Sequence, residues 1–182
     1  SKKDKSPVLQ KYIGIGRDAL GIDKFGALWY RPRQTEYIKM VVNKYKAAKG
    51  IPVRRRSSTP MDERGEAFPD SEQPGHDAGI CREVVMSLLF VARATRREIL
   101  YATTRLGRVV GNWGKKRDRA LFKLICYMAW TADLGPVSVV HPDELRKLVL
   151  RLWWDSDHAN SPDTERSTSG WIPWLIGVPT RV

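Results

Sequence analysis

Two patterns divide the first 50 residues of the chain. Short runs at 12–17 and 26–31, rich in β-branched and aromatic residues, flank a turn-forming segment and predict a β-hairpin. From residue 35, apolar side chains follow at three- and four-residue steps, which predicts an amphipathic helix. Its apolar face comprises Tyr37, Ile38, Val41, Val42 and Tyr45, and Gly50 and Pro52 are expected to end it.

Helical spacing returns in three stretches between residues 77 and 134, which predicts a central bundle of three helices. Thr95 and Glu98 have the spacing of a capping box at the start of the second helix. The expected buried positions are Ile80, Val84, Val85, Leu88, Val91 and Ala92, then Ile99, Ala102, Leu106, Val109 and Val110, then Leu121, Leu124, Ile125 and Met128.

Beyond residue 137 the apolar period changes to two. Residues 148–155 alternate in this way and 171–177 form a second apolar run, so a C-terminal hairpin is expected. The order of hairpin, helices and hairpin predicts an α+β fold. We divide the chain into segments 1–50, 51–76, 77–134 and 135–182, of which 51–76 is a charged, Pro- and Gly-rich flexible connector.

The distribution of charge along the chain indicates what kind of partner the protein binds. The chain carries 32 basic and 20 acidic residues, a net charge of +12, and six of the acids lie within residues 62–77. The remainder is therefore strongly basic, which favours a polyanion such as RNA or DNA. Acidic protein neighbours are the alternative, and no small-molecule substrate is expected.

Cysteine usage favours an intracellular reducing compartment, such as the cytoplasm, the nucleus or an organelle interior. Cys81 and Cys126 lie in apolar helical patterns, and buried free thiols are expected. The three histidines lack the spacing of zinc ligands. No apolar run reaches the roughly 18 residues of a membrane span. Because the chain begins with Ser, we expect a processed product or a piece of a longer protein.

Three motifs in register resemble the polyprotein of copia-type LTR retrotransposons. Residues 86–92 read Met-Ser-Leu-Leu-Phe-Val-Ala, 95–99 read Thr-Arg-Arg-Glu-Ile, and 166–170 read Arg-Ser-Thr-Ser-Gly. These are similar to the family's Gly-Ser-Leu-Leu-Tyr-Leu-Ala, Thr-Arg-Pro-Asp-Ile and Arg-Ser-Thr-Ser-Gly. Further matches are Tyr101-Ala102, Leu106-Gly107-Arg108 and residues 154–160, and residues 12–15 and 34–38 look like the hairpin and helix that follow the polymerase palm.

The resemblance implies a reverse transcriptase's C-terminal thumb and connection region, followed by the start of an RNase H domain. Residues 1–50 would then correspond to the end of the palm and primer grip. Two-metal hydrolysis needs carboxylates from several elements, and the family's polymerase acids and later RNase H acids would lie outside residues 1–182. Asp155, and with it Asp157, is therefore interpreted as a remnant of the catalytic site, with a weak Mg²⁺ site as the alternative.

Basic side chains are the candidates for nucleic-acid contact. Arg97, Tyr101, Arg105 and Arg108 follow at helical steps and are expected to share a thumb-like face. A second candidate group starts the next helix, and a third lies in the connector. The second group is Lys115, Lys116, Arg117 and Arg119, and the third is Arg54, Arg55 and Arg56. Ordinary solvated faces are the alternative for all three groups.

The last apolar strand is the candidate protein contact. An unpaired apolar edge invites strand addition or aggregation, and Trp171, Trp174, Leu175 and Ile176 would be exposed on it. We therefore expect a protein partner over residues 171–182. Overall the sequence predicts a non-catalytic fragment or repurposed descendant of the reverse transcriptase that binds structured RNA or an RNA–DNA duplex. A structural scaffold subunit of a large assembly, and part of an active enzyme completed by other segments, are the alternatives.

Overall fold

The computed structural model describes residues 11–12, 15–50, 52–53, 55–62, 73–146, 148–157 and 168–177. Within these ranges the fold is α+β, as predicted. Contacts divide the chain into two compact units, one from the ranges 1–18 and 32–136 and the other from 19–31 and 137–182. Both units are discontinuous in sequence, whereas the segmentation expected from the sequence is continuous and stays a prediction.

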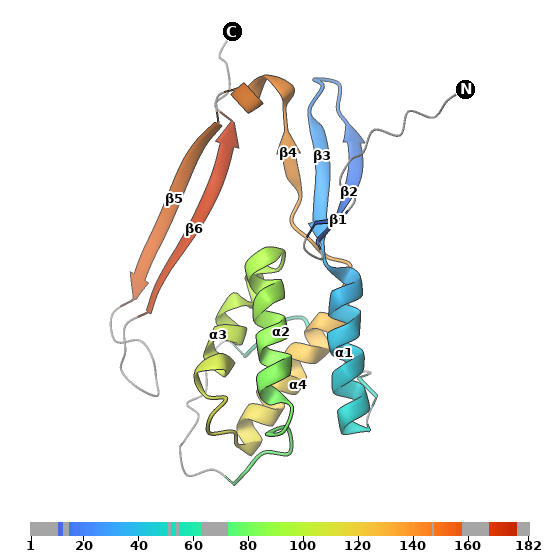
Figure 1. Cartoon of the computed structure of the whole chain (residues 1–182), viewed down its shortest axis with the longest axis vertical. Coiled ribbons are helices and arrows are strands. Elements are labelled where there is room, and N and C mark those ends of the chain that lie inside the picture. The colour runs from blue at the N-terminus through green and yellow to red at the C-terminus, as the bar shows by residue number, and fades with distance from the viewer. Residues whose placement is uncertain are drawn as a thin grey trace, which may run out of the picture. The chain divides into compact units, whose positions relative to one another are not determined.

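The first unit is a bundle of helices (Figure 1). Its helices are α1 (Thr35–Lys49), α2 (Cys81–Ala94), α3 (Leu100–Arg108) and α4 (Lys115–Trp130), and a 3-10 turn, η1 (Arg97–Ile99), precedes α3. α1 packs against α2 and α4, and α3 packs against the same two helices. In the part of the chain that the structure describes, no helix is long and apolar enough to cross a membrane.

The core of this unit is built from the apolar faces that the sequence predicts. Ile38, Leu88, Leu106 and Leu124 are fully buried, one from each helix. Each such side chain contributes about 1.5–3 kcal/mol relative to an exposed one. α1 ends where expected, at Gly50, which adopts the left-handed φ of 64° that glycine tolerates best.

The predicted capping box is wrong. Thr95 Oγ1 donates to Gln34 Oε1 at 3.0 Å, and Glu98 Oε1 accepts from Arg96 Nε at 2.5 Å. Arg96 is almost completely buried and also donates to Thr131 O at 2.7 Å and to Thr131 Oγ1 at 2.6 Å. The segment therefore links the start of α1 to the end of α4, instead of capping its own helix.

The predicted N-terminal hairpin is confirmed and extended. Strands β1 (Lys11–Tyr12), β2 (Ile15–Ile22), β3 (Leu28–Arg33) and β4 (Ser138–Val140) form one antiparallel sheet in the order β1-β2-β3-β4. The register places Trp29 opposite Val139. Residues 138–140 thus pair with the N-terminal hairpin, whereas the sequence placed them with the C-terminal strands.

Asp23 holds the turn between β2 and β3. Its carboxylate accepts hydrogen bonds from Phe25 N at 2.9 Å, Ala27 N at 3.0 Å and Trp29 Nε1 at 3.0 Å. The Trp29 bond, followed by the Ala27 bond, lowers the pKa of Asp23. His141 Nε2 lies 2.6 Å from Phe25 O, so the segment before η2 (Pro142–Arg146) also contacts the turn.

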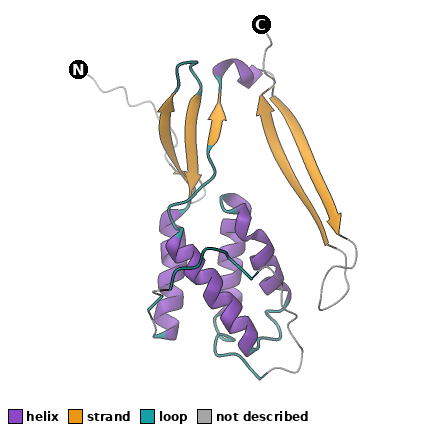
Figure 2. Cartoon of the chain, turned by 180° about the vertical axis from the view of Figure 1, so that it is seen from behind, coloured by secondary structure: helices purple, strands orange, loops and turns teal. Residues whose placement is uncertain are grey.

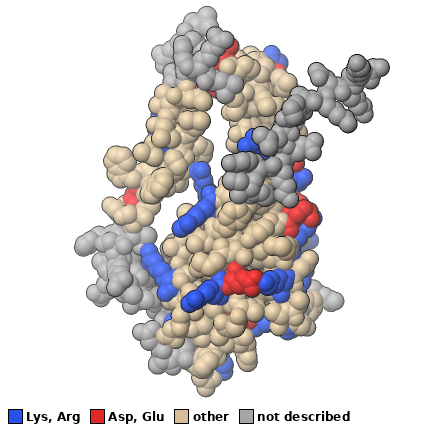
Figure 3. All heavy atoms as spheres, viewed as in Figure 1, with Lys and Arg blue, Asp and Glu red and all other residues tan. Residues whose placement is uncertain are grey.

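The predicted C-terminal hairpin is present as β5 (Leu148–Asp157) and β6 (Thr168–Gly177), a two-stranded antiparallel sheet. One face pairs Leu150 with Leu175 and Trp154 with Trp171, and the other pairs Trp153 with Ile172. These side chains are 40–81% exposed. Few charged atoms interrupt this ladder in the view of Figure 3.

Candidate nucleic-acid interface

The expected stripe on the second bundle helix is interrupted. Arg97 lies in η1, whose 3-10 geometry changes the angle between successive residues, while Tyr101, Arg105 and Arg108 lie in α3. Tyr101 and Arg108 are exposed, but Arg105 is only 7% exposed and donates from Nη1 to the Tyr101 hydroxyl at 3.4 Å. Arg105 is therefore not part of an exposed face.

The basic run that opens α4 is also divided. Lys115, Lys116 and Arg119 are exposed, whereas Arg117 is 1% exposed. Consecutive helical residues point in different directions, so at least one member of such a run must face the core of a packed helix. The Lys115 ammonium donates to Gln73 Oε1 at 2.5 Å.

The connector contributes two described arginines, because Arg54 lies outside the described residues. Arg55 and Arg56 are both exposed. The guanidinium of Arg56 lies over the ring of Trp130, 3.4 Å from its centroid. Such a cation–π contact, worth about 0.5–1 kcal/mol at an exposed site, restricts the side chain and orients its N–H groups.

The connector and α4 together enclose a hollow of about 390 Å³, which we call the α4 hollow. α4 lies in front of the other helices of the bundle in Figure 2, which views the chain from behind. Arg55 and Arg56 come from the connector, while Arg119 and Lys123 come from successive turns of α4. The remaining lining residues are Ser57, Ser58, Thr59, Asp62, Phe122 and Cys126.

The α4 hollow is electropositive. Its lining has four basic side chains and one acid, Asp62, which forms an ion pair with Lys123. Ser57 Oγ donates to Thr59 O at 2.7 Å. Burial raises the pKa of the Cys126 thiol, an effect that the charge of Arg55 partly offsets, and the thiol therefore adds no negative charge near neutral pH. Guanidinium, ammonium and hydroxyl groups in one hollow are the donors that phosphate oxygens accept from.

A larger hollow, about 750 Å³, lies at the start of α1, but its charges are balanced. The lining acid Asp18 pairs with Arg33 at 2.7 Å, and Glu36 pairs with Lys39 at 3.4 Å. Asp133 and Arg17 complete the charged lining. This hollow does not favour an anion over a cation.

The segment before α2 is fixed to the start of α4 by the carboxylate of Asp118. Oδ2 accepts from His76 N at 2.7 Å, and Oδ1 accepts from Asp77 N at 3.0 Å and from Trp113 Nε1 at 2.8 Å. Gly75 N donates to Trp113 O at 2.8 Å, and a Cβ on Gly75 would lie only 2.7 Å from the Asp118 carboxylate. The segment therefore has a defined position on α4.

The buried carboxylate of Asp77 joins the same segment to α1. It accepts from the Tyr45 hydroxyl at 2.8 Å and forms an ion pair with Lys49. Burial, together with the bond to Asp77, raises the pKa of Tyr45, so the phenol remains protonated throughout the physiological range. Three separated parts of the chain, α1, residues 73–77 and α4, thus meet at this end of the bundle.

The expected remnant of a metal site lies on the C-terminal hairpin. Asp155 is exposed and pairs across the ladder with Gly170, while the side chain of Asp157 lies outside those described. Among the described residues, no group of three His, Cys, Asp or Glu side chains gathers in a way that suits a metal ion. The weak Mg²⁺ site therefore gains no support from them.

The expected protein-contact residues are on β6. Trp171 is 68% exposed, Trp174 51% and Leu175 65%, and Ile176 is half-buried. The exposure that the sequence predicts is present at three of the four positions. A partner over them stays a prediction.

Sequence reasoning missed Lys123, Phe122 and the hydroxyls of residues 57–59. One signal was available, since Arg119 and Lys123 are four apart on a predicted helix and must share a face. Their approach to Arg55 depends on the path of the connector, which no local pattern gives. No protein-family model matches the chain, and the searches of curated proteins and of solved structures also return no match.

Proposed function

We propose that the chain is a non-catalytic nucleic-acid-binding protein, a repurposed descendant of a copia-type reverse transcriptase. The proposed descent rests on the sequence motifs. The binding proposal rests on one observation, which is that Arg55, Arg56, Arg119 and Lys123 line a single hollow although they come from segments some 60 residues apart.

The hollow binds the nucleic-acid backbone. Arg56, oriented by Trp130, and Arg55 donate to phosphate oxygens from the connector, while Arg119 and Lys123 donate from α4. The Lys123 ammonium has three N–H groups, so it donates to phosphate while it keeps its ion pair with Asp62. Backbone contacts of this kind carry no sequence information, so binding is sequence-independent.

The salt dependence of binding to a labelled RNA hairpin tests this proposal. Each phosphate contact contributes about 0.7–0.9 to the slope of log K against log salt. Replacing Arg55, Arg56 and Arg119 together by Gln is expected to flatten the slope by about 2.

A matched control removes the same charge elsewhere on the helical unit. Arg17, Arg82 and Arg93 are exposed and do not line the α4 hollow. Replacing these three by Gln is expected to change the slope by much less. Equal slopes for the two triple variants would show that the net charge, rather than the hollow, governs binding, and would refute the proposal.

The exposed β5–β6 ladder favours a second candidate function, that of a scaffold subunit. Its apolar side chains, and outer edges that pair with no other strand among the described residues, suit an extended protein segment added beside β6. Such a partner slows amide exchange across residues 171–177. Fast exchange of these amides in the native assembly would contradict the scaffold proposal.

A further inference from the structure

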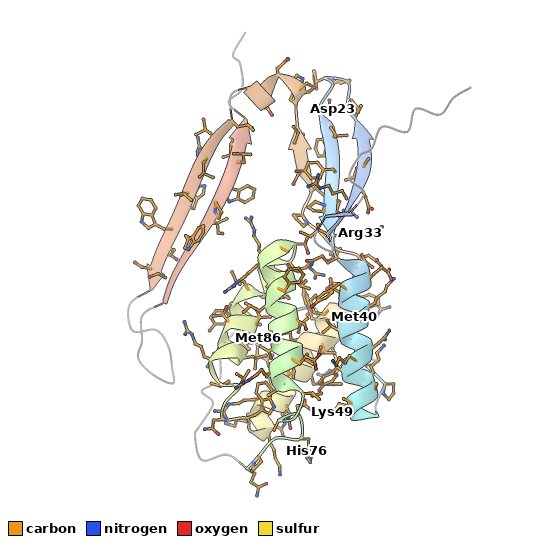
Figure 4. All side chains as sticks on the ribbon, in the orientation of Figure 1. Asp23, Arg33, Met40, Lys49, His76 and Met86 are labelled. Carbon is orange, nitrogen blue, oxygen red and sulfur yellow. The ribbon has the colours of Figure 1, made fainter. Side chains whose placement is uncertain are left out.

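A second basic hollow, about 310 Å³, lies beside the first, and we call it the bundle-end hollow. Lys49 comes from the end of α1, His76 from the segment before α2, and Lys115 from the first turn of α4. Lys49 and His76 lie at the same end of the bundle in Figure 4. Tyr45, Asp118, Arg119 and Phe122 complete the lining.

The two hollows share a wall. Arg119 and Phe122 line both of them, and they lie on one face of α4 because they are three residues apart. The shared wall therefore contains one cation and one aromatic ring. Arg55, Arg56 and Lys123 lie on one side of it, and Lys49 and Lys115 lie on the other.

The ring of Phe122 has a fixed position between these cations. It is half-buried and packs against Tyr45, with ring centroids 6.5 Å apart and planes at 36°. Tyr45 is itself held by its hydroxyl on Asp77. The exposed part of the Phe122 ring is thus a preformed apolar surface, which costs little conformational entropy to use.

The acids at the two hollows are already engaged. Asp62 pairs with Lys123, Asp77 pairs with Lys49 beneath the bundle-end hollow, and Asp118 accepts three N–H groups. With these two ion pairs set aside, Arg55, Arg56, Arg119 and Lys115 remain against the one carboxylate of Asp118, so the surface stays favourable for an anion.

We infer that the two hollows form one track for an unpaired nucleic-acid segment, with a base against Phe122 and backbone phosphates in the hollow on each side. This inference rests on the proposed function and names its ligand class. Cations along a groove with an aromatic ring between them are the arrangement that binds single strands without sequence preference. In a duplex the base faces are stacked on their neighbours and cannot reach the ring, so an unpaired strand or the loop of a structured RNA is the ligand.

Anisotropy titrations with two probes test the inference, a labelled uridine oligomer and a blunt RNA duplex at the same salt concentration. Phe122→Leu keeps an apolar side chain but removes the aromatic face. It is expected to weaken oligomer binding about five- to tenfold, the low end of what loss of base stacking gives because leucine keeps some apolar contact, and to change duplex binding less than twofold.

Phe90→Leu is the matched control. Phe90 is also a partly exposed ring on the bundle, and it packs edge-on against Tyr37 at 5.5 Å. This variant is expected to leave both affinities unchanged. Circular dichroism shows whether each variant is folded. A 5-iodouridine oligomer, cross-linked to the wild-type chain, gives a readout that needs no substitution, and the cross-link is expected on Phe122.

The outcomes separate the inference from the proposed function. If Phe122→Leu leaves oligomer binding unchanged, or the cross-link lies outside the two hollows, the track is refuted. The proposed function survives that result if the Arg55, Arg56 and Arg119 variant still flattens the salt slope. Wild-type chain that binds neither probe would refute both.

Discussion

Removing the carboxylate of Asp118 is expected to destabilise the helical unit strongly. Asp118→Ala leaves three N–H donors without their acceptor: His76 N, Asp77 N and Trp113 Nε1. A hydrogen bond contributes about 0.5–1.5 kcal/mol net, and more where an acceptor is charged. His76 is exposed, so its N–H regains a hydrogen bond to water more readily than the Trp113 indole N–H. We therefore expect the free energy of unfolding to fall by about 2–4 kcal/mol, less than the sum of three charged hydrogen bonds.

A graded variant sharpens this prediction. Asp118→Asn keeps one acceptor oxygen, and Oδ1 alone accepts two of the three bonds. With the amide oxygen in that position, only the bond from His76 is lost, and the expected destabilisation is about 1–2 kcal/mol. The order of stability is therefore wild type, then Asn, then Ala.

Urea denaturation followed by far-ultraviolet circular dichroism measures these differences. Asp133 provides the control, because it is an exposed acid just beyond the other end of α4. Asp133→Ala is expected to change the free energy of unfolding by less than about 0.5 kcal/mol. If Asp118→Ala and Asp133→Ala cost the same, the carboxylate does not hold the segment before α2 on α4.

Three further predictions concern backbone space, a buried cation and a turn. Gly75→Ala is expected to lower the free energy of unfolding in urea by about 1–3 kcal/mol, because its Cβ would lie 2.7 Å from Gly114 O. Gly79 is the control, since a Cβ there meets open space and Gly79→Ala should change the free energy of unfolding little. Arg96→Ala should lower the free energy of unfolding by about 2–4 kcal/mol, since it removes three hydrogen bonds of a buried guanidinium. Arg97 is exposed beside it, and Arg97→Ala should change the free energy of unfolding by about 0.5 kcal/mol or less. Equal effects of the two substitutions would contradict the buried role of Arg96. Because the folded-state pKa of Asp23 is lowered, its contribution is fully present above the unfolded value of 3.8 and is lost as pH falls through the lowered pKa. Trp29 indole N–H signals in nuclear magnetic resonance should shift in that acidic window, and a shift centred above pH 3.8 would contradict the sign.

Local periodicity was enough to place the bundle helices and their buried faces. Ile38, Leu88 and Leu124 are buried as the spacing predicts, because a helix face needs only three- and four-residue steps to be recognised. The same reasoning failed at Thr95, whose hydroxyl bonds to Gln34 from 61 residues away in sequence. A strong local signature thus gave way to a tertiary partner.

The candidate site was predicted residue by residue but not as an assembly. Arg105 and Arg117 were assigned to the surface by their charge, yet both are buried, and the Arg105 guanidinium has a hydrogen-bond partner within the fold in Tyr101. Arg55 and Arg119 were named in separate groups. What brings them together is the path of the connector over α4, and a basic loop has no periodicity from which that path could be inferred.

The β5–β6 ladder has a consequence for how the two strands find their alignment. In most half-buried sheets a shift of one residue moves apolar side chains into water, and this cost selects one pairing. Here both faces are apolar over most of their length, so a one-residue slip replaces one apolar face by another and costs little in burial. Pro173 has no N–H to donate, so any pairing that turns its backbone nitrogen toward β5 lacks one hydrogen bond of the ladder. Burial thus contributes little to the register of β5 and β6, and the proline opposite Leu152 only limits which pairings keep every hydrogen bond.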